Sequence, residues 1–152
     1  MKFFHLTYGL YLVVYLFIVT CCCDIFAYFG GMTCYKLLKN KVHKLNERIS
    51  PKKTIEGSVI GTIFGTGLGF LFAMLVLNKF VSYPWYVYLI LSFVLAICGQ
   101  IGDLMLSAIK RYFVVKDYSS LLPGHGGVLD RIDSLLINFM VAAIFLTVLT
   151  YI

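Results

Sequence analysis

Four polar residues lie at helical spacing near the end of an apolar run: Asp103, Ser107, Lys110 and Arg111. Offsets of 0, +4, +7 and +8 from Asp103 place them on one face of a helix. Lys110 and Arg111 alone would be explained as anchors whose charged ends reach the membrane surface. A carboxylate inside an apolar stretch has no such explanation and is a functional-site candidate by default.

A glycine-rich loop follows these residues. Pro123 and Gly124 favour a tight, irregular backbone. Gly126 and Gly127 would let a ligand approach the main chain closely. His125 stands between the glycines and adds a titratable side chain to the same loop. The loop is therefore a candidate ligand-binding segment.

Two acidic residues, Asp130 and Asp133, are spaced to share a face where the last helix is expected to begin. Acidic residues in a first helical turn also pair favourably with the helix dipole, and for Asp133 alone that explanation is equally good. It does not account for the whole cluster, because His125, the glycines and Asp103 would have no role.

Carboxylates beside several cations suit a divalent metal and a phosphate-bearing substrate. Mg²⁺ takes one or two carboxylates and keeps its other positions for water and substrate phosphates. Asp103 and Asp130 alone would repel a polyanion, whereas with Mg²⁺ they would hold the ion that neutralises charge in phosphoryl transfer. Lysine and arginine would supply further phosphate contacts. A zinc site is less favoured, because His43 and His125 are far apart and no cysteine spacing supports one.

An upstream segment, residues 50–57, carries further phosphate-binding candidates: Ser50, Lys52, Lys53 and Thr54. A helix cap followed by topology-setting positive charge explains the same residues equally well. The site hypothesis requires the two basic loops, residues 36–53 and 110–131, to meet in space.

The composition identifies the setting of these residues. Of 152 residues, 61% are hydrophobic and only 13% are charged, which excludes a soluble enzyme and a disordered chain. The net charge of +6 is concentrated in two stretches between apolar runs. That distribution is typical of cytoplasmic loops in a membrane protein, so we expect no nucleic-acid partner.

Four apolar runs predict an all-α integral membrane protein with about four transmembrane helices in a single membrane domain, residues 1–152. The first run is too long for a signal peptide and has no small-residue cleavage site after it. The predicted spans are about 4–23, 58–77, 84–106 and 134–152.

The two basic loops predict the orientation. Residues 36–53 carry seven basic side chains and residues 110–131 carry four, so both loops should be cytoplasmic in a multi-pass protein of the cell membrane. Both chain ends then face the other side, which predicts further spans upstream. A transporter is not favoured, because its ionisable groups should lie near mid-membrane rather than at the cytoplasmic edge.

The second apolar run contains a row of small residues. Gly57, Gly61, Gly65 and Gly69 recur every fourth residue, and Ala73 continues the row. This spacing places them on one helix face, where small residues let two helices approach closely in lipid. We therefore predict close packing, with a dimer seam as one possibility. A phosphate-cradling loop is less favoured because the row is regular.

The polar residues from Ser107 onward form one ungapped pattern that resembles the signature of the phosphatidate cytidylyltransferases, also called CDP-diglyceride synthases. Residues 50–57 resemble a second motif of that family. Asp24, Ala27, Tyr28 and Gly31 resemble a third, and the resemblance covers roughly residues 20–140. The polar positions of the main signature are Ser107, Lys110, Arg111, Lys116, Asp117, His125, Asp130, Arg131 and Asp133.

The resemblance implies that CTP and phosphatidic acid form CDP-diacylglycerol and pyrophosphate with Mg²⁺ as the cofactor. It implies Asp103 and Asp130 as the metal ligands. The expected catalytic residues are these two with Lys110, Arg111, Lys116, Asp117, His125, Arg131 and Asp133. The expected substrate-binding residues are Ser50, Lys52, Lys53, Thr54, Ser107, Gly124, Gly126 and Gly127.

The chain departs from the family pattern in two respects. Met32 follows Gly31, where family members usually have a basic residue. Family members are also longer, so this chain resembles their C-terminal catalytic half and is expected to act alone, as a homodimer, or with a separate N-terminal part. The alternatives are an inactive or partner-dependent membrane subunit and a CTP-dependent lipid kinase.

Overall fold

The structure is a computed structural model that describes the chain except for residues 1, 38–42, 47–49, 114–128 and 152. The side chains of residues 2–7, 46, 51–52, 129–133 and 150–151 also lie outside the description. The elements in chain order are α1 (Lys2–Leu37), β1 (Lys44–Asn46), β2 (Ser50–Thr54), α2 (Ile55–Leu75), the short 3₁₀ helix η1 (Leu77–Lys79), α3 (Trp85–Tyr112) and α4 (Leu129–Tyr151).

The helices have the length and composition of membrane spans. Within the described residues, three apolar stretches are long enough to cross a bilayer: Tyr8–Leu37, Ile55–Lys79 and Trp85–Tyr112. The stretch Ser134–Leu149 of α4 is apolar but shorter. The prediction of an essentially all-α membrane protein is therefore confirmed, with three to four helices suited to span.

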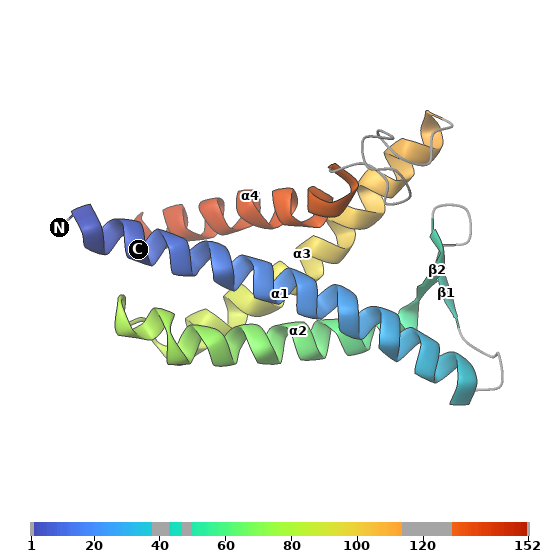
Figure 1. Ribbon diagram of the computed structural model, residues 1–152, viewed down its shortest axis with the longest axis horizontal. Helices are drawn as coiled ribbons and strands as arrows, with labels where there is room; N and C mark the ends of the chain where they lie inside the picture. The colour runs from blue at the N-terminus through green and yellow to red at the C-terminus, as the bar shows by residue number, and fades with distance from the viewer. Residues whose placement is uncertain (1, 38–42, 47–49, 114–128, 152) are drawn as a thin grey trace.

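The helices alternate in direction, so that functional segments gather at one end (Figure 1). The end of α1, the β hairpin, the start of α2, the end of α3 and the start of α4 all lie at this end. Both chain termini lie at the opposite end. The helix ends that flank the two basic segments therefore lie on the same side of the bundle.

Two local features differ from the sequence prediction. Helix α1 continues past the predicted boundary at Cys23 as far as Leu37. Hydropathy detects only the apolar part of a helix, whereas the backbone hydrogen bonds of α1 continue into its more polar end. The hairpin was not predicted either: β1 and β2 pair antiparallel, with Lys44 opposite Thr54. The predicted helix cap is confirmed at Thr54, whose hydroxyl accepts a hydrogen bond from the Gly57 amide at 3.1 Å.

The predicted close packing of the glycine row is confirmed, and its partner is α1 of the same chain. Gly57, Gly61, Gly65, Gly69 and Ala73 are the buried residues of α2. A Cβ atom added at Gly61 would lie 2.5 Å from the carbonyl oxygen of Cys23. The row is thus covered within the chain, in a regular helix. It forms neither an open seam for a second copy nor a phosphate-cradling loop.

Buried polar side chains join the other helices. The Tyr15 hydroxyl lies 2.8 Å from Ser92 Oγ and links α1 to α3. Asn138 Nδ2 donates to Thr20 Oγ1 at 2.8 Å and links α4 to α1. In an apolar medium such groups need internal partners, so these bonds help fix which helix faces meet.

Candidate active site

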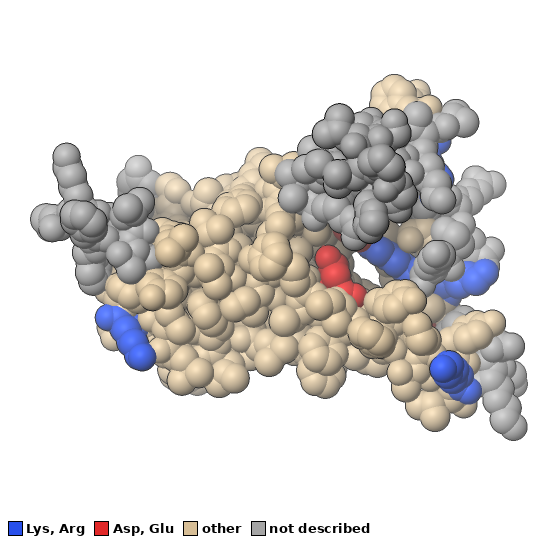
Figure 2. All heavy atoms as spheres, viewed as in Figure 1, with Lys and Arg blue, Asp and Glu red and all other residues tan. Residues whose placement is uncertain are grey.

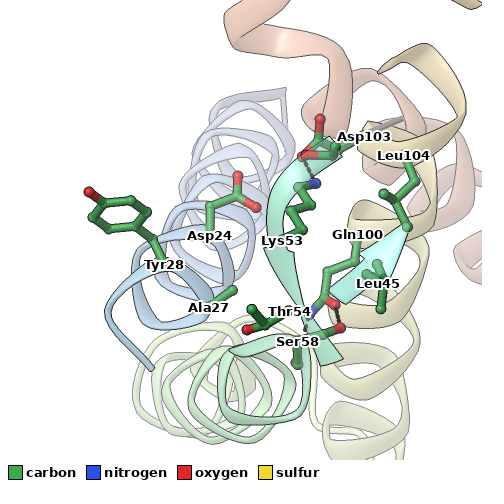
Figure 3. Close-up of a pocket in the computed structure, with 11 residues that line it drawn as sticks. Asp24, Ala27, Tyr28, Leu45, Lys53, Thr54, Ser58, Gln100, Asp103 and Leu104 are labelled. Atoms are coloured by element: carbon green, nitrogen blue, oxygen red, sulfur yellow. Dashed lines mark hydrogen bonds and ion pairs between the residues drawn. The ribbon is translucent and has the colours of Figure 1, made fainter. Parts of the chain in front are cut away.

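A pocket of about 340 Å³ opens where α1, the hairpin, α2 and α3 meet (Figure 3). We call it the hairpin pocket. Each of these elements contributes at least one polar side chain, and several apolar side chains complete the wall. The lining residues are Asp24, Ala27, Tyr28, Leu45, Ser50, Lys53, Thr54, Ser58, Gln100, Asp103 and Leu104.

An ion pair joins the upstream segment to the end of the third apolar run. Lys53 on β2 donates from its ammonium group to Asp103 Oδ2 on α3. The side chains are 33% and 24% exposed, so the pair is partly shielded from solvent. Ser107, one turn later on α3, has its hydroxyl 3.5 Å from Asp103 Oδ1. Ser50 and Thr54 line the same pocket.

The hairpin is held at its base by Glu56 in the first turn of α2. Glu56 Oε1 accepts from the His43 backbone amide at 3.0 Å and lies 2.9 Å from His43 Nδ1. The Ile55 amide donates to the His43 carbonyl at 2.9 Å. These contacts fix the entry to β1 against the start of α2. They thereby hold Lys53 over the pocket.

A second carboxylate in the pocket, Asp24 on α1, was not predicted as a site residue. Figure 3 shows its side chain on the same side of the pocket as Lys53 and Asp103. The sequence did contain a signal, because an acidic residue follows an apolar run and begins the third family-like motif. The pocket therefore combines two carboxylates with one lysine among its lining residues.

The inner wall of the pocket holds a second unpredicted residue, Gln100 on α3. Its side-chain amide bonds to Ser58 and Thr62 on α2 and to Cys23 on α1. A polar residue one turn before Asp103 in an apolar run was the available signal. Its partners could not be read from the sequence, because Cys23 is 77 positions away.

The two basic residues at the end of α3 differ in exposure. Lys110 is buried, with 9% of its surface exposed, whereas Arg111 is exposed. Adjacent helical residues point about 100° apart, so one turns inward and the other outward. Neither belongs to the lining of the hairpin pocket.

The remaining predicted residues lie outside what the structure describes. Lys116, Asp117, Gly124, His125, Gly126 and Gly127 belong to the undescribed segment 114–128. Asp130, Arg131 and Asp133 begin α4, at the same end of the bundle as the pocket, but their side chains are not described (Figure 1). The side chain of Lys52 is likewise outside the description.

The charge pattern at the pocket suits a metal–phosphate ligand. Figure 2 shows acidic atoms in a hollow of this face and basic side chains beside it at the hairpin end, with a further basic group at the opposite end. Carboxylate and hydroxyl oxygens are the ligands Mg²⁺ prefers, and one or two carboxylates suffice. Among the described residues, no three His, Cys, Asp or Glu side chains gather into a fuller metal cage. The carboxylates and hydroxyl groups that line the pocket are of the kind that Mg²⁺ can use.

Three curated relatives are similar to this chain over most of its length. The phosphatidate cytidylyltransferase of Staphylococcus haemolyticus (strain JCSC1435) is 42% identical over 128 residues, 83% of this chain and 45% of that protein. The Bacillus subtilis (strain 168) enzyme of the same name is 39% identical over 129 residues, 85% of this chain and 45% of that protein. The Staphylococcus aureus (strain COL) enzyme of that name is 41% identical over 128 residues, with 83% and 45% covered. The chain spans about half the length of these curated relatives.

The match to the family extends over almost the whole chain. Residues 3–149 match the Cytidylyltransferase family, from the first turns of α1 to the last turns of α4. The matched range contains every residue that lines the hairpin pocket. The resemblance found in the polar motifs is thereby confirmed, and this chain belongs to the cytidylyltransferase family.

Proposed function

We propose that this chain carries the transfer site of a phosphatidate cytidylyltransferase. The reaction converts CTP and phosphatidic acid into CDP-diacylglycerol and pyrophosphate. The observation that carries the proposal is the ion pair between Lys53, which belongs to the second family-like motif, and Asp103, an expected metal ligand, in one pocket. The printed name of the relatives supports the same activity.

The chemistry requires positioning rather than a protein nucleophile. An oxygen of the phosphatidic acid phosphate attacks the α-phosphorus of CTP, and a new P–O bond forms. The bond from the α-phosphorus to the oxygen that bridges to the β-phosphate breaks, and pyrophosphate leaves with that electron pair. The lipid phosphate is already anionic, so no base has to be regenerated. The site must hold two anions close together, which makes positive charge the main requirement.

Lys53 is the described cation best placed for this task. It is paired with Asp103, which compensates both charges at the partly buried pocket. A triphosphate entering the pocket would offer Lys53 a second anionic partner. The hydroxyl groups of Ser50 and Thr54 line the same wall and would donate to phosphate oxygens.

We assign Mg²⁺ to Asp103 and Asp130, with Asp24 as a further carboxylate of the pocket wall. Bound there, the ion would neutralise charge on the triphosphate and stabilise the leaving pyrophosphate. Lys110, Arg111, Lys116, Asp117, His125, Arg131 and Asp133 would complete the polar surroundings of the two substrates. The Gly124–Gly127 loop would approach a phosphate or the nucleotide through its backbone.

The proposal includes an orientation and an assembly. The basic segments at the hairpin end face the cytoplasm, where CTP is available, in a multi-pass protein of the cell membrane. The chain works as a homodimer or with a separate N-terminal part. Because α1 covers the glycine row, such a partner would use another face of the bundle.

The position of the labelled phosphate in CTP distinguishes this reaction from its closest alternative, a CTP-dependent lipid kinase. The purified full chain in mixed micelles receives phosphatidic acid or a polyprenol, with CTP labelled at either the α- or the γ-phosphate. Transfer of the α-label to phosphatidic acid supports the proposed reaction. Transfer of the γ-label to polyprenol would replace it with the kinase.

A binding arm addresses the second alternative, a chain that is inactive without a partner. Mg²⁺–CTP is titrated onto the same preparation, whose folding is checked by its thermal transition. Binding without product formation would assign nucleotide recognition to this chain and the complete reaction to an assembly. A folded chain that neither binds nor transfers would contradict the proposal.

A further inference from the structure

Gln100 makes hydrogen bonds to both of the other helices that form the hairpin pocket. On the α2 side, its Nε2 lies 3.2 Å from the Ser58 carbonyl oxygen and 3.0 Å from Thr62 Oγ1. On the α1 side, the same nitrogen lies 2.9 Å from Cys23 Sγ. Its Oε1 accepts from the Ser58 hydroxyl. One amide therefore uses both its donor and its acceptor capacity to join three helices.

The partners of Gln100 are neighbours of the residues that carry charge in the pocket. Cys23 directly precedes Asp24 on α1. Gln100 lies one turn before Asp103 on α3. Ser58 lies one turn after Thr54, and Thr54 is the residue at which the hairpin passes into α2. The hydrogen bonds of the Gln100 amide thus join the three chain segments that carry Asp24, Asp103 and the end of β2, and they fix the distances between these segments.

The glycine row is what brings Cys23 within reach of this amide. A Cβ atom at Gly61 would lie 2.5 Å from the Cys23 carbonyl oxygen, and one at Gly65 would lie 2.9 Å from Cys23 Cβ. The backbones of α1 and α2 therefore touch beside Gln100. Cys23 is 2% exposed, so its contact with the amide lies inside the bundle.

A neutral amide suits this place better than a charged group. Two carboxylates, Asp24 and Asp103, line the same pocket as Gln100. A third negative charge would add repulsion, while an apolar side chain would leave the Ser58 and Thr62 oxygens without this donor. An amide satisfies those oxygens without changing the charge of the pocket.

We propose that Gln100 is a positioning residue for the transfer reaction, which fixes the spacing of the Asp24 and Asp103 segments around Lys53. This inference rests on the proposed function. A displacement of about 1 Å between reacting groups costs about 100-fold in rate. We therefore expect loss of the Gln100 bonds to lower turnover per folded molecule.

The test compares Gln100→Leu with Tyr15→Phe in the full chain. Tyr15 is a matched control because its buried hydroxyl also bonds α1 to α3, but it does not line the hairpin pocket. For Gln100→Leu we expect kcat per folded molecule to fall about 10- to 100-fold. For Tyr15→Phe we expect a lower thermal transition with kcat per folded molecule unchanged. An unchanged kcat in Gln100→Leu, or an equal loss in both variants, would overturn the proposal.

A distance measurement separates the positioning role from the reaction itself. Spin-labelled unnatural amino acids replace Phe29 on α1 and Met105 on α3, two exposed residues outside the pocket lining. This labelling leaves all five cysteines in place, including Cys23. We expect a narrow distance distribution in the otherwise native chain and in Tyr15→Phe, and a broader one in Gln100→Leu.

The same distribution in all three proteins would overturn the positioning role whether or not the chain is active. If the native chain is folded but has no transferase activity, the proposed function fails by itself. The distance data then still decide whether Gln100 fixes the two segments.

Discussion

The α1–α2 interface and the hairpin pocket are neighbouring regions held together in opposite ways. Along the interface, the buried residues of α2 are four glycines and an alanine, and the helix backbones approach closely. At the pocket, the helices are joined by side chains: an ion pair from the hairpin to α3 and the amide bonds of Gln100. The buried α2 residues of the interface carry no polar side chain, whereas the pocket is lined by several polar and charged side chains.

The difference shows how a short membrane chain can position reactive groups. Water is absent from the lipid interior, so the hydrophobic effect contributes little to helix association and close contact must contribute more. The glycine row provides that contact and begins at Gly57, three residues after the N-cap Thr54 of the pocket wall. The packed α1–α2 interface therefore sets the distance between these two helices at the point where the hairpin pocket begins.

The largest expected effect is at the polar region, in Asp103→Asn. The amide keeps the shape of the carboxylate but removes its charge, so it pairs poorly with Lys53 and with Mg²⁺. We expect cytidylyl transfer to fall about 100- to 1,000-fold, similar to the loss of a charge-stabilising group in other enzymes. The measurement is the initial rate of CDP-diacylglycerol formation at saturating CTP.

Gly67→Ala serves as the control for this variant. A Cβ atom at Gly67 has no atom within 4 Å, and the residue is exposed on α2. Its rate should match the native chain. If Asp103→Asn keeps the native rate as well, the polar region has been assigned the wrong role.

The next effect sharpens the boundary between the two regions and uses two glycines of the same row. Gly61→Leu and Gly69→Leu both force side chains into the α1 contact, so each should destabilise the fold by about 1–3 kcal/mol. Of these two positions, Gly61 lies against Cys23, whereas a side chain at Gly69 would meet Val19 and Ser92. We therefore expect lower turnover per folded molecule in Gly61→Leu alone.

Thermal unfolding in detergent and rates normalised to folded protein provide the comparison. Equal turnover in the two leucine variants would mean that the distance between α1 and α2 does not affect the geometry of the hairpin pocket. Unchanged stability in both would contradict the packing role of the row.

The smallest expected effect is at the junction of the regions, in Thr54→Val. Valine is close in shape to threonine but cannot accept the 3.1 Å hydrogen bond from the Gly57 amide. Loss of an N-cap costs about 1 kcal/mol of stability. The matched variant Thr54→Ser keeps an acceptor and should retain the stability of the native chain. A valine variant as stable as the serine variant would show that the cap contributes nothing.

Much of the packed region could be predicted from the sequence, because its signals are local and periodic. Hydropathy predicted the membrane helices, and the four-residue spacing of the glycines predicted their buried face. The partner of that face was not predictable in the same way. A row of small residues fits any smooth helix, so it does not distinguish α1 from a second copy.

The polar region could be predicted only in part. Its motifs indicated that Lys53 and Asp103 belong to one site, but the hairpin that joins them was missed. The strands are only three and five residues long, and Ser50–Thr54 is too polar to show the alternation that predicts a strand. Asp24 and Gln100 were missed as site residues because their importance depends on contacts between helices far apart in sequence.

The central claim is that the hairpin pocket binds the nucleotide, and photolabelling tests it most directly. A CTP analogue with a photoreactive group on the cytosine is bound with Mg²⁺ to the full chain, irradiated, and the labelled peptides are identified by mass spectrometry. We predict labels in the pocket-lining segments 24–28, 45–58 and 100–104, prevented by excess CTP and weakened in Asp103→Asn. Labels confined to the opposite end of the bundle, or labels insensitive to both CTP and Asp103→Asn, would contradict the account.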